Sequence, residues 1–146
     1  MDSVNIVYSL LALVGGIAIG IQAVVNGGLG KKVGTMEASF ISFFIGTAAL
    51  FFTVLFFGKG NILAISEVPK MNLIGGLLGA FYVFVMVLVT PKIGVVATLM
   101  TVIVGQLLIG SIIDHFGLFG GERFAFEPTK LFALLLMLIG VFLFNK

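Results

Sequence analysis

Long apolar runs alternate with short polar segments along the whole chain. None of the runs shows the period of two that is typical of strands in a membrane barrel. An α-helix needs about 20 predominantly apolar residues to cross the hydrocarbon core of a bilayer. The pattern therefore predicts an all-α, polytopic membrane protein with five transmembrane helices. Their approximate bounds are 4–25, 38–57, 72–90, 94–113 and 129–144.

Glycine, proline and charge mark the expected breaks between these spans. The segment 26–32, which reads Asn-Gly-Gly-Leu-Gly-Lys-Lys, is expected to end the first span. Pro91 disfavours helix at Thr90 and lacks an N–H, so we expect only a tight turn there. The polar connections 58–70 and 114–128 are too short to form a soluble domain. The organisation predicts a single transmembrane domain over residues 1–146.

The composition agrees with this prediction. The chain is 60% hydrophobic and 10% charged, with a mean hydropathy of +1.30, whereas a soluble domain carries about 25% charged residues. The N-terminus lacks the positive region of a cleaved signal peptide, so the first span is expected to be retained. Cysteine is absent, which excludes disulfides, thiolate metal sites and thiol catalysis.

The eight Lys and Arg residues divide evenly between the two predicted faces of the membrane. Orientation is set mainly by an excess of Lys and Arg in short cytoplasmic loops, so this chain is expected to insert both ways round. Opposite copies would then pair as an antiparallel homodimer of ten helices. On the side of the N-terminus lie Lys59, Lys70, Arg123 and Lys130. On the other side lie Lys31, Lys32, Lys92 and Lys146.

An odd number of spans strengthens this expectation, because two antiparallel copies are then related by a two-fold axis in the membrane plane. Many transporters reach that symmetry through inverted repeats, with the substrate site at their interface near the midplane. A weak internal repeat at an offset of about 60 relates two helical hairpins, or else reflects chance in a chain with 20 glycines. The recurring pairs are Gly15-Gly16 with Gly75-Gly76, Lys32-Val33-Gly34 with Lys92-Ile93-Gly94, and Ile45-Gly46 with Val104-Gly105.

Small residues recur at helical spacing in the first four spans. Such ladders let helix backbones approach closely in a membrane. They serve packing within one subunit, or some of them are sliding surfaces during transport. The ladders are Ala12, Gly16, Gly20; Ala38, Ser42, Gly46; Gly75, Gly79; and Ala97, Thr101, Gly105.

Polar side chains within the spans are the candidates for substrate binding. Gln22 and Asn26 are four residues apart and so share one helix face. Gln106 lies in the middle of the fourth span, Tyr82 adds a hydroxyl in the third, and Ser42 is a lesser candidate. A buried amide without a partner costs a few kcal/mol. These groups therefore either hydrogen-bond between helices or line a cavity that meets substrate.

The charged candidates lie at span ends. Glu37 opens the second span, where it either complements the helix dipole or couples transport to an ion. Asp114 and His115 close the fourth span, as a solvated helix end or as coupling or gating groups. No carboxylate lies in the middle of a span, which weighs against an acid-centred proton antiporter and mildly favours neutral, zwitterionic or anionic substrates.

An enzyme is not expected. The chain has one His and no Cys, and it lacks the common metalloprotease, nucleophile-elbow and phosphate-loop motifs. We predict no cofactor and no metal site. The cations are scattered rather than gathered in a basic patch, so we expect no nucleic acid partner.

A series of short motifs runs in order along nearly the whole chain. They are Gln22-x-x-x-Asn26-x-x-Leu29-Gly30, Ser42-Phe43-x-x-Gly46-Thr47, Gly75-Gly76-x-x-Gly79-Ala80-x-Tyr82, Pro91-x-x-Gly94, Gly105-Gln106, Asp114-His115-Phe116-Gly117 and Gly140. In these motifs the chain resembles the small five-span branch of the drug/metabolite transporter superfamily, the YdcZ-type family. The resemblance implies a multi-pass protein of the bacterial inner membrane that carries a small metabolite or drug. Glu37 departs from the small or apolar residue expected there, and Gln22 stands in the span where related small multidrug resistance proteins use a Glu.

Together these observations predict a dual-topology transporter that works by alternating access. Two alternatives remain open: a dual-topology channel for a small ion or solute, and a non-transporting membrane partner subunit. The expected substrate-binding residues are Gln22, Asn26, Tyr82, Gln106 and Ser42. The expected coupling or gating residues are Asp114, His115 and Glu37.

Overall fold

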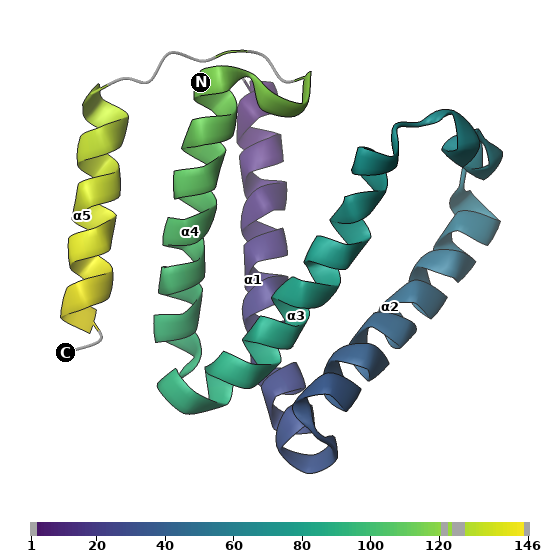
Figure 1. The fold of residues 1–146 in the computed structure, drawn as a ribbon, viewed down its shortest axis with the longest axis horizontal. Helices are drawn as coiled ribbons and strands as arrows, with labels where there is room; N and C mark the ends of the chain where they lie inside the picture. The colour runs from purple at the N-terminus through teal and green to yellow at the C-terminus, as the bar shows by residue number, and fades with distance from the viewer. Residues whose placement is uncertain (1–2, 121–122, 124–127, 145–146) are drawn as a thin grey trace. The chain divides into compact units, whose positions relative to one another are not determined.

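The computed structural model describes residues 3–120, 123 and 128–144, and every regular element within them is a helix. The all-α prediction is therefore confirmed for the described chain (Figure 1). The α-helices are α1 (Ser3–Val33), α2 (Thr35–Phe57), α3 (Ile74–Ile93), α4 (Val95–Phe116) and α5 (Pro128–Phe144). Short 3-10 helices are η1 (Ile62–Glu67), η2 (Lys70–Leu73) and η3 (Leu118–Gly120).

Four of the described helical segments are long and apolar enough to cross a membrane. The helix α5 is shorter, with 17 residues. At a rise of about 1.5 Å per residue it reaches about 26 Å, slightly less than a hydrocarbon core of about 30 Å. The fifth span thus remains a prediction. The four candidate spans are Ile6–Val33, Thr35–Phe57, Lys70–Ile93 and Val95–Phe116.

The first span does not end at the glycine-rich segment, contrary to the sequence prediction. Helix α1 continues through these glycines and reaches Val33. The reason is packing against α3: a Cβ at Gly27 would lie 3.3 Å from Cγ of Pro91, and a Cβ at Gly30 would overlap Cγ1 of Val87. Gly27 and Gly30 therefore let α3 pack closely against α1, and they do not interrupt the helix.

The predicted turn at Thr90-Pro91-Lys92 is also wrong, because α3 runs through Pro91 to Ile93. Proline in a helix removes the hydrogen bond to the carbonyl four residues earlier. Pro91 lies in the last turn of α3, so few backbone hydrogen bonds depend on its position. Its ring also packs against Gly27, where no side chain opposes it.

The helices are instead interrupted at two glycines, one between α1 and α2 and one between α3 and α4, which share one backbone conformation. Gly34 has φ 104° and ψ 152°, and Gly94 has φ 86° and ψ 162°. This region of backbone space is open almost only to glycine. Each carbonyl then starts a new helix: Gly34 accepts from N of Ala38 at 3.0 Å, and Gly94 accepts from N of Thr98 at 3.2 Å. This equivalence supports the internal repeat.

The chain forms two compact units, Met1–Lys92 and Ile93–Lys146. In the first unit a small core joins the C-terminal end of α1, the start of α2 and the second half of α3 (Figure 1). Away from this junction, α2 and α3 diverge. The core consists of Ala38, Val83 and Val87, with Leu29, Phe43 and Tyr82 packed against it.

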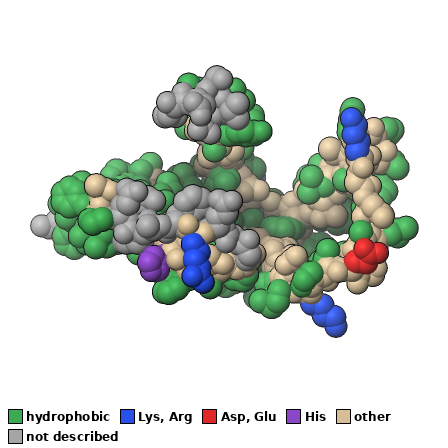
Figure 2. All heavy atoms as spheres, turned by 90° about the horizontal axis from the view of Figure 1, so that it is seen from above, with side chains coloured by type: hydrophobic (Ala, Val, Ile, Leu, Met, Phe, Trp, Pro, Cys, Tyr) green, Lys and Arg blue, Asp and Glu red, His purple; other side chains and the backbone are tan. Residues whose placement is uncertain are grey.

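In the second unit α4 contacts α5, and Leu134 of α5 is buried. Large apolar side chains remain exposed on all five helices; Leu11 of α1 and Phe56 of α2, for example, are 61% and 71% exposed. Figure 2 shows hydrophobic side chains over much of the viewed face, with Lys and Arg side chains standing singly. Lipid is the solvent that such a surface requires.

Candidate functional site

A polar cluster joins α1 and α2 in the first unit. Nδ2 of Asn26 donates a hydrogen bond to Oγ of Ser42 at 2.9 Å, and the Asn26 side chain is only 7% exposed. Gln22 lies one turn before Asn26 on the same face. Gln22 and Ser42 line a cavity of about 200 Å³ together with Phe43, Gly46, Thr47 and Leu50.

The position of Gly34 explains why these residues meet. Asn26 and Ser42 each lie eight residues from Gly34, and Gln22 and Gly46 each lie twelve residues from it. In a helical hairpin that reverses at Gly34, residues at equal sequence separation from Gly34 lie opposite each other on the two helices. The small residues of α2 thus face the amides of α1, which leaves room for the Asn26 hydrogen bond and for a cavity beside Gln22.

Tyr82 belongs to the same unit but has a different environment. Its side chain packs against the core of Ala38, Val83 and Val87, and it is not among the described residues that line the Gln22 cavity. Nearby, Thr90 is 5% exposed and its Oγ1 has no hydrogen-bond partner within the described chain. Sequence reasoning overlooked Thr90 because it was assigned to a turn.

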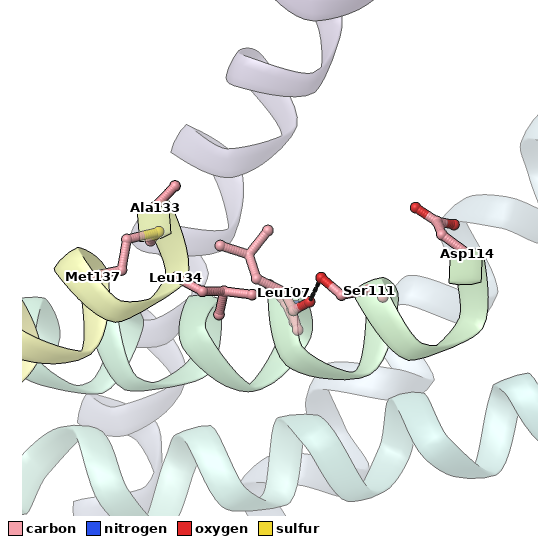
Figure 3. A pocket seen from close by; sticks show the side chains of 8 residues that line it. Leu107, Ser111, Asp114, Ala133, Leu134 and Met137 are labelled. Atoms are coloured by element: carbon pink, nitrogen blue, oxygen red, sulfur yellow. Dashed lines mark hydrogen bonds between the residues drawn. The ribbon is translucent and has the colours of Figure 1, made fainter. Parts of the chain in front are cut away.

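A second cavity lies between α4 and α5 in the other unit and has a volume of about 330 Å³ (Figure 3). It brings together Gln106 and Asp114, which the sequence assigned to substrate binding and to coupling respectively. Ser111 lies between them, and its Oγ donates to the carbonyl of Leu107 at 2.7 Å. The remaining lining residues are Leu107, Gly110, Ala133, Leu134 and Met137.

The other two charged candidates lie elsewhere. His115 lines a separate hollow with Ser111, Ile112 and Phe116, and its ring meets that of Phe116 edge-on at 4.8 Å. Consecutive residues of a helix point about 100° apart, which is why Asp114 and His115 enter different hollows.

Glu37 lies in the first turn of α2, and its carboxylate folds back over Gly34. This is where a negative charge complements the helix dipole. Within the described residues no three His, Cys, Asp or Glu side chains gather as metal ligands would.

A family model described as "Putative inner membrane exporter, YdcZ" matches residues 7–143, from α1 to α5. The chain belongs to the YdcZ family. No curated protein and no solved structure matches it. The resemblance drawn from the motifs is thereby confirmed, and this YdcZ-family protein is a multi-pass transporter of the inner membrane.

Family membership changes how the two cavities are interpreted. In an exporter of the YdcZ family, polar groups within apolar helices are candidates for contact with the transported molecule, and membership points to transport rather than to an enzyme reaction. Two such groups stand out, Gln22-Asn26-Ser42 and Gln106-Ser111-Asp114. Sequence reasoning did not predict that α5 contributes to a cavity, although Ser111 could have been found from its position on the face shared by Leu107 and Asp114.

Proposed function

We propose that this protein exports a small metabolite or drug by alternating access, as an antiparallel homodimer. Each chain is a single transmembrane domain of five spans, and the two copies insert in opposite orientations. The observation that carries this proposal is the even distribution of cations between the two ends of the helices.

Six of the eight cations have described, exposed side chains, and they divide three against three. A transmembrane chain is held in one orientation by an excess of such residues on the cytoplasmic side. With no excess, neither orientation is favoured. Lys31, Lys32 and Lys92 lie in the last turns of α1 and α3. Lys59 and Lys70 belong to the connection between α2 and α3, and Arg123 to the connection between α4 and α5. The proposed topology assigns the first three to one face of the membrane and the other three to the opposite face.

The cavity beside Gln22 supports transport rather than packing alone. Asn26 has a partner in Ser42, whereas the Gln22 side chain is exposed and borders open volume. In a bilayer a polar amide is costly without a partner. We assign Gln22, Asn26 and Ser42 to substrate binding at the cavity of the first unit. Tyr82, beside the core of that unit, and Gln106, in the cavity of the second unit, are further candidates for substrate binding. The roles of Asp114, His115 and Glu37 in coupling or gating are part of the same proposal.

Orientation can be measured directly because the chain has no native cysteine. A single cysteine introduced as Gly60→Cys, between α2 and α3, reports one face of the membrane. In intact cells a membrane-impermeant thiol reagent is expected to label about half of the molecules, since about half face outward. Gly16→Cys, in the middle of α1, is the control for non-specific labelling. Complete labelling, or none in intact cells with full labelling after lysis, would show a single orientation.

Transport is tested by comparing the metabolites released by cells that express Gln22→Ala, Asn26→Ala or the unmodified chain. We expect release to fall more than dimer formation does, because the amides contact substrate rather than the partner copy. Thr53→Ala is the matched control, since the Thr53 hydroxyl only bonds back to the carbonyl of Ala49. Equal loss of dimer and release would assign the amides to packing. Ion flux well above about a thousand per second would indicate a channel instead of conformational cycling.

A further inference from the structure

We propose that the cavity between α4 and α5 binds an amphiphilic primary ammonium ion, with its NH₃⁺ group at Asp114 and its apolar chain along α5. The proposal rests on the transport function above and names a substrate class for it. It reverses the expectation of a neutral or anionic substrate, because that expectation considered only acids in the middle of a span. Asp114 lies at a span end, yet it reaches a cavity that continues into the span.

The cavity has a charged end and an apolar wall. Ser111 and Asp114 point to the same side of α4 in Figure 3, and α5 faces the cavity with Ala133, Leu134 and Met137. Gln106 and Asp114 are eight residues apart on one helix, which corresponds to about 12 Å along its axis. A bound molecule could therefore meet a carboxylate at one end, an amide two turns away, and aliphatic groups between them.

The electrostatics favour a cation. Asp114 lies in the last turn of α4, where the helix dipole places partial negative charge. No Lys or Arg is among the described residues that line the cavity. The Ser111 hydroxyl uses its hydrogen on the carbonyl of Leu107, so it can only accept a hydrogen bond from a ligand. With the carboxylate and the Gln106 carbonyl, the site offers acceptor oxygens to a ligand that donates.

This set of groups selects N–H cations over permanently alkylated ones. Quaternary ammonium ions are recognised mainly by faces of aromatic rings, and none of the described lining residues is aromatic. A primary ammonium has three N–H donors, which match acceptor oxygens. Charge-assisted hydrogen bonds of this kind are about twice as strong as neutral ones.

The volume of the cavity and its apolar lining suit a short alkyl chain. A volume of about 330 Å³ lies at the lower end of small-molecule sites, which run from about 300 to 1,000 Å³. Met137 and Leu134 supply apolar contact, and an unbranched thioether adapts to ligands of different shape. A neutral lipid chain could fill this volume, but it would bring no N–H donor to the Asp114 carboxylate.

The test measures binding of octylammonium, octyltrimethylammonium and octanol to the protein in nanodiscs of uncharged lipid, corrected with empty nanodiscs. Octylammonium is expected to bind most tightly. Asp114→Asn should weaken its binding by about tenfold or more through loss of the charged partner and should leave octanol unchanged. Glu67→Gln is the matched control, because it removes an exposed carboxylate in η1, outside both polar cavities.

A second variant tests the cavity by changing its volume without changing its charge. Ala133→Phe fills the cavity from α5 and should abolish octylammonium binding while Asp114 is still present. Thermal unfolding of each variant checks that the helices remain folded. Equal affinity for octanol and octylammonium, or binding that survives both Asp114→Asn and Ala133→Phe, would overturn the proposal.

The experiments distinguish failure of the proposed substrate class from failure of the proposed antiparallel pairing. Binding in nanodiscs does not depend on how the chain inserts in cells, whereas thiol labelling depends on nothing else. Loss of specific octylammonium binding with two-sided labelling would remove only the substrate class. Specific binding with one-sided labelling would remove only the antiparallel pairing.

Discussion

Two glycine pairs of α1, one in each half of the helix, lie in opposite surroundings. Gly27 and Gly30 face α3, and a Cβ at either position would press on Pro91 or Val87. At Gly15 and Gly16 no heavy atom of the described chain, apart from the adjoining stretch of α1 itself, lies within 4 Å of where a Cβ would stand. Glycines therefore form a contact between helices near one end of α1, whereas at the other end they leave the helix surface open.

This difference shows that a small-residue ladder predicts close approach without saying what approaches. In a membrane, helices associate through packing and hydrogen bonds, and small residues let backbones come close. Near Gly30 the chain supplies its own partner in Val87. At Gly15 and Gly16 the surface remains available to lipid or to a second copy, and their repeat counterparts Gly75-Gly76 are equally open.

The largest effect is expected from Gly30→Leu. The new side chain would occupy the space of Val87 Cγ1, and Val87 is 2% exposed with a stiff β-branched side chain. Overpacking of this kind costs about 1–3 kcal/mol and sometimes more. The midpoint temperature of thermal unfolding in detergent is expected to fall strongly. An unchanged midpoint would mean that α1 and α3 do not pack at Gly30.

Gly34→Ala is expected to come next. Its φ of 104° is unfavourable for any residue with a Cβ, which costs about 1–3 kcal/mol, and the added methyl would also press on the Glu37 carboxylate. Gly28→Ala is the matched control, because that position is helical and open and alanine should stabilise the helix by up to about 1 kcal/mol. Opposite shifts of the unfolding midpoint are the expected result.

Ser42→Ala should have a smaller effect on stability, since it removes one hydrogen bond from Asn26. Such bonds in membrane proteins average about 0.6 kcal/mol and reach about 1.7 kcal/mol. Export is expected to fall more than stability does, because the bond positions Asn26 beside the Gln22 cavity. A double-mutant cycle with Asn26→Ala measures the coupling, and fully additive effects would contradict a direct bond.

The smallest effect on unfolding is expected from Gly16→Leu. No described atom opposes the new side chain, so the free energy of unfolding should change by no more than about 0.5 kcal/mol. If the open glycines meet a second copy, cross-linking between two copies should decrease. Destabilisation as large as that of Gly30→Leu would abolish the distinction between the two halves of α1.

Hydrophobic patterning predicted the helical class and the membrane location, and ordered motifs predicted the family. Sequence analysis also placed Gln22, Asn26 and Ser42 among the same candidates, and the structure joins Asn26 to Ser42. It misplaced two helix ends because glycine and proline were interpreted from local propensity. In both cases a contact between α1 and α3 overrides that propensity, and such a contact cannot be found from one segment.

Membrane insertion and helical class were determined by the residue pattern, because the cost of exposing backbone polar groups to lipid leaves few alternatives to helices. Which glycines break a helix and which admit a neighbour was decided by the packing of α1 against α3. The shared cavity of Gln106 and Asp114 was likewise decided only when α5 packed against α4. A cavity is bounded by side chains from separate helices, so its existence depends on their relative positions.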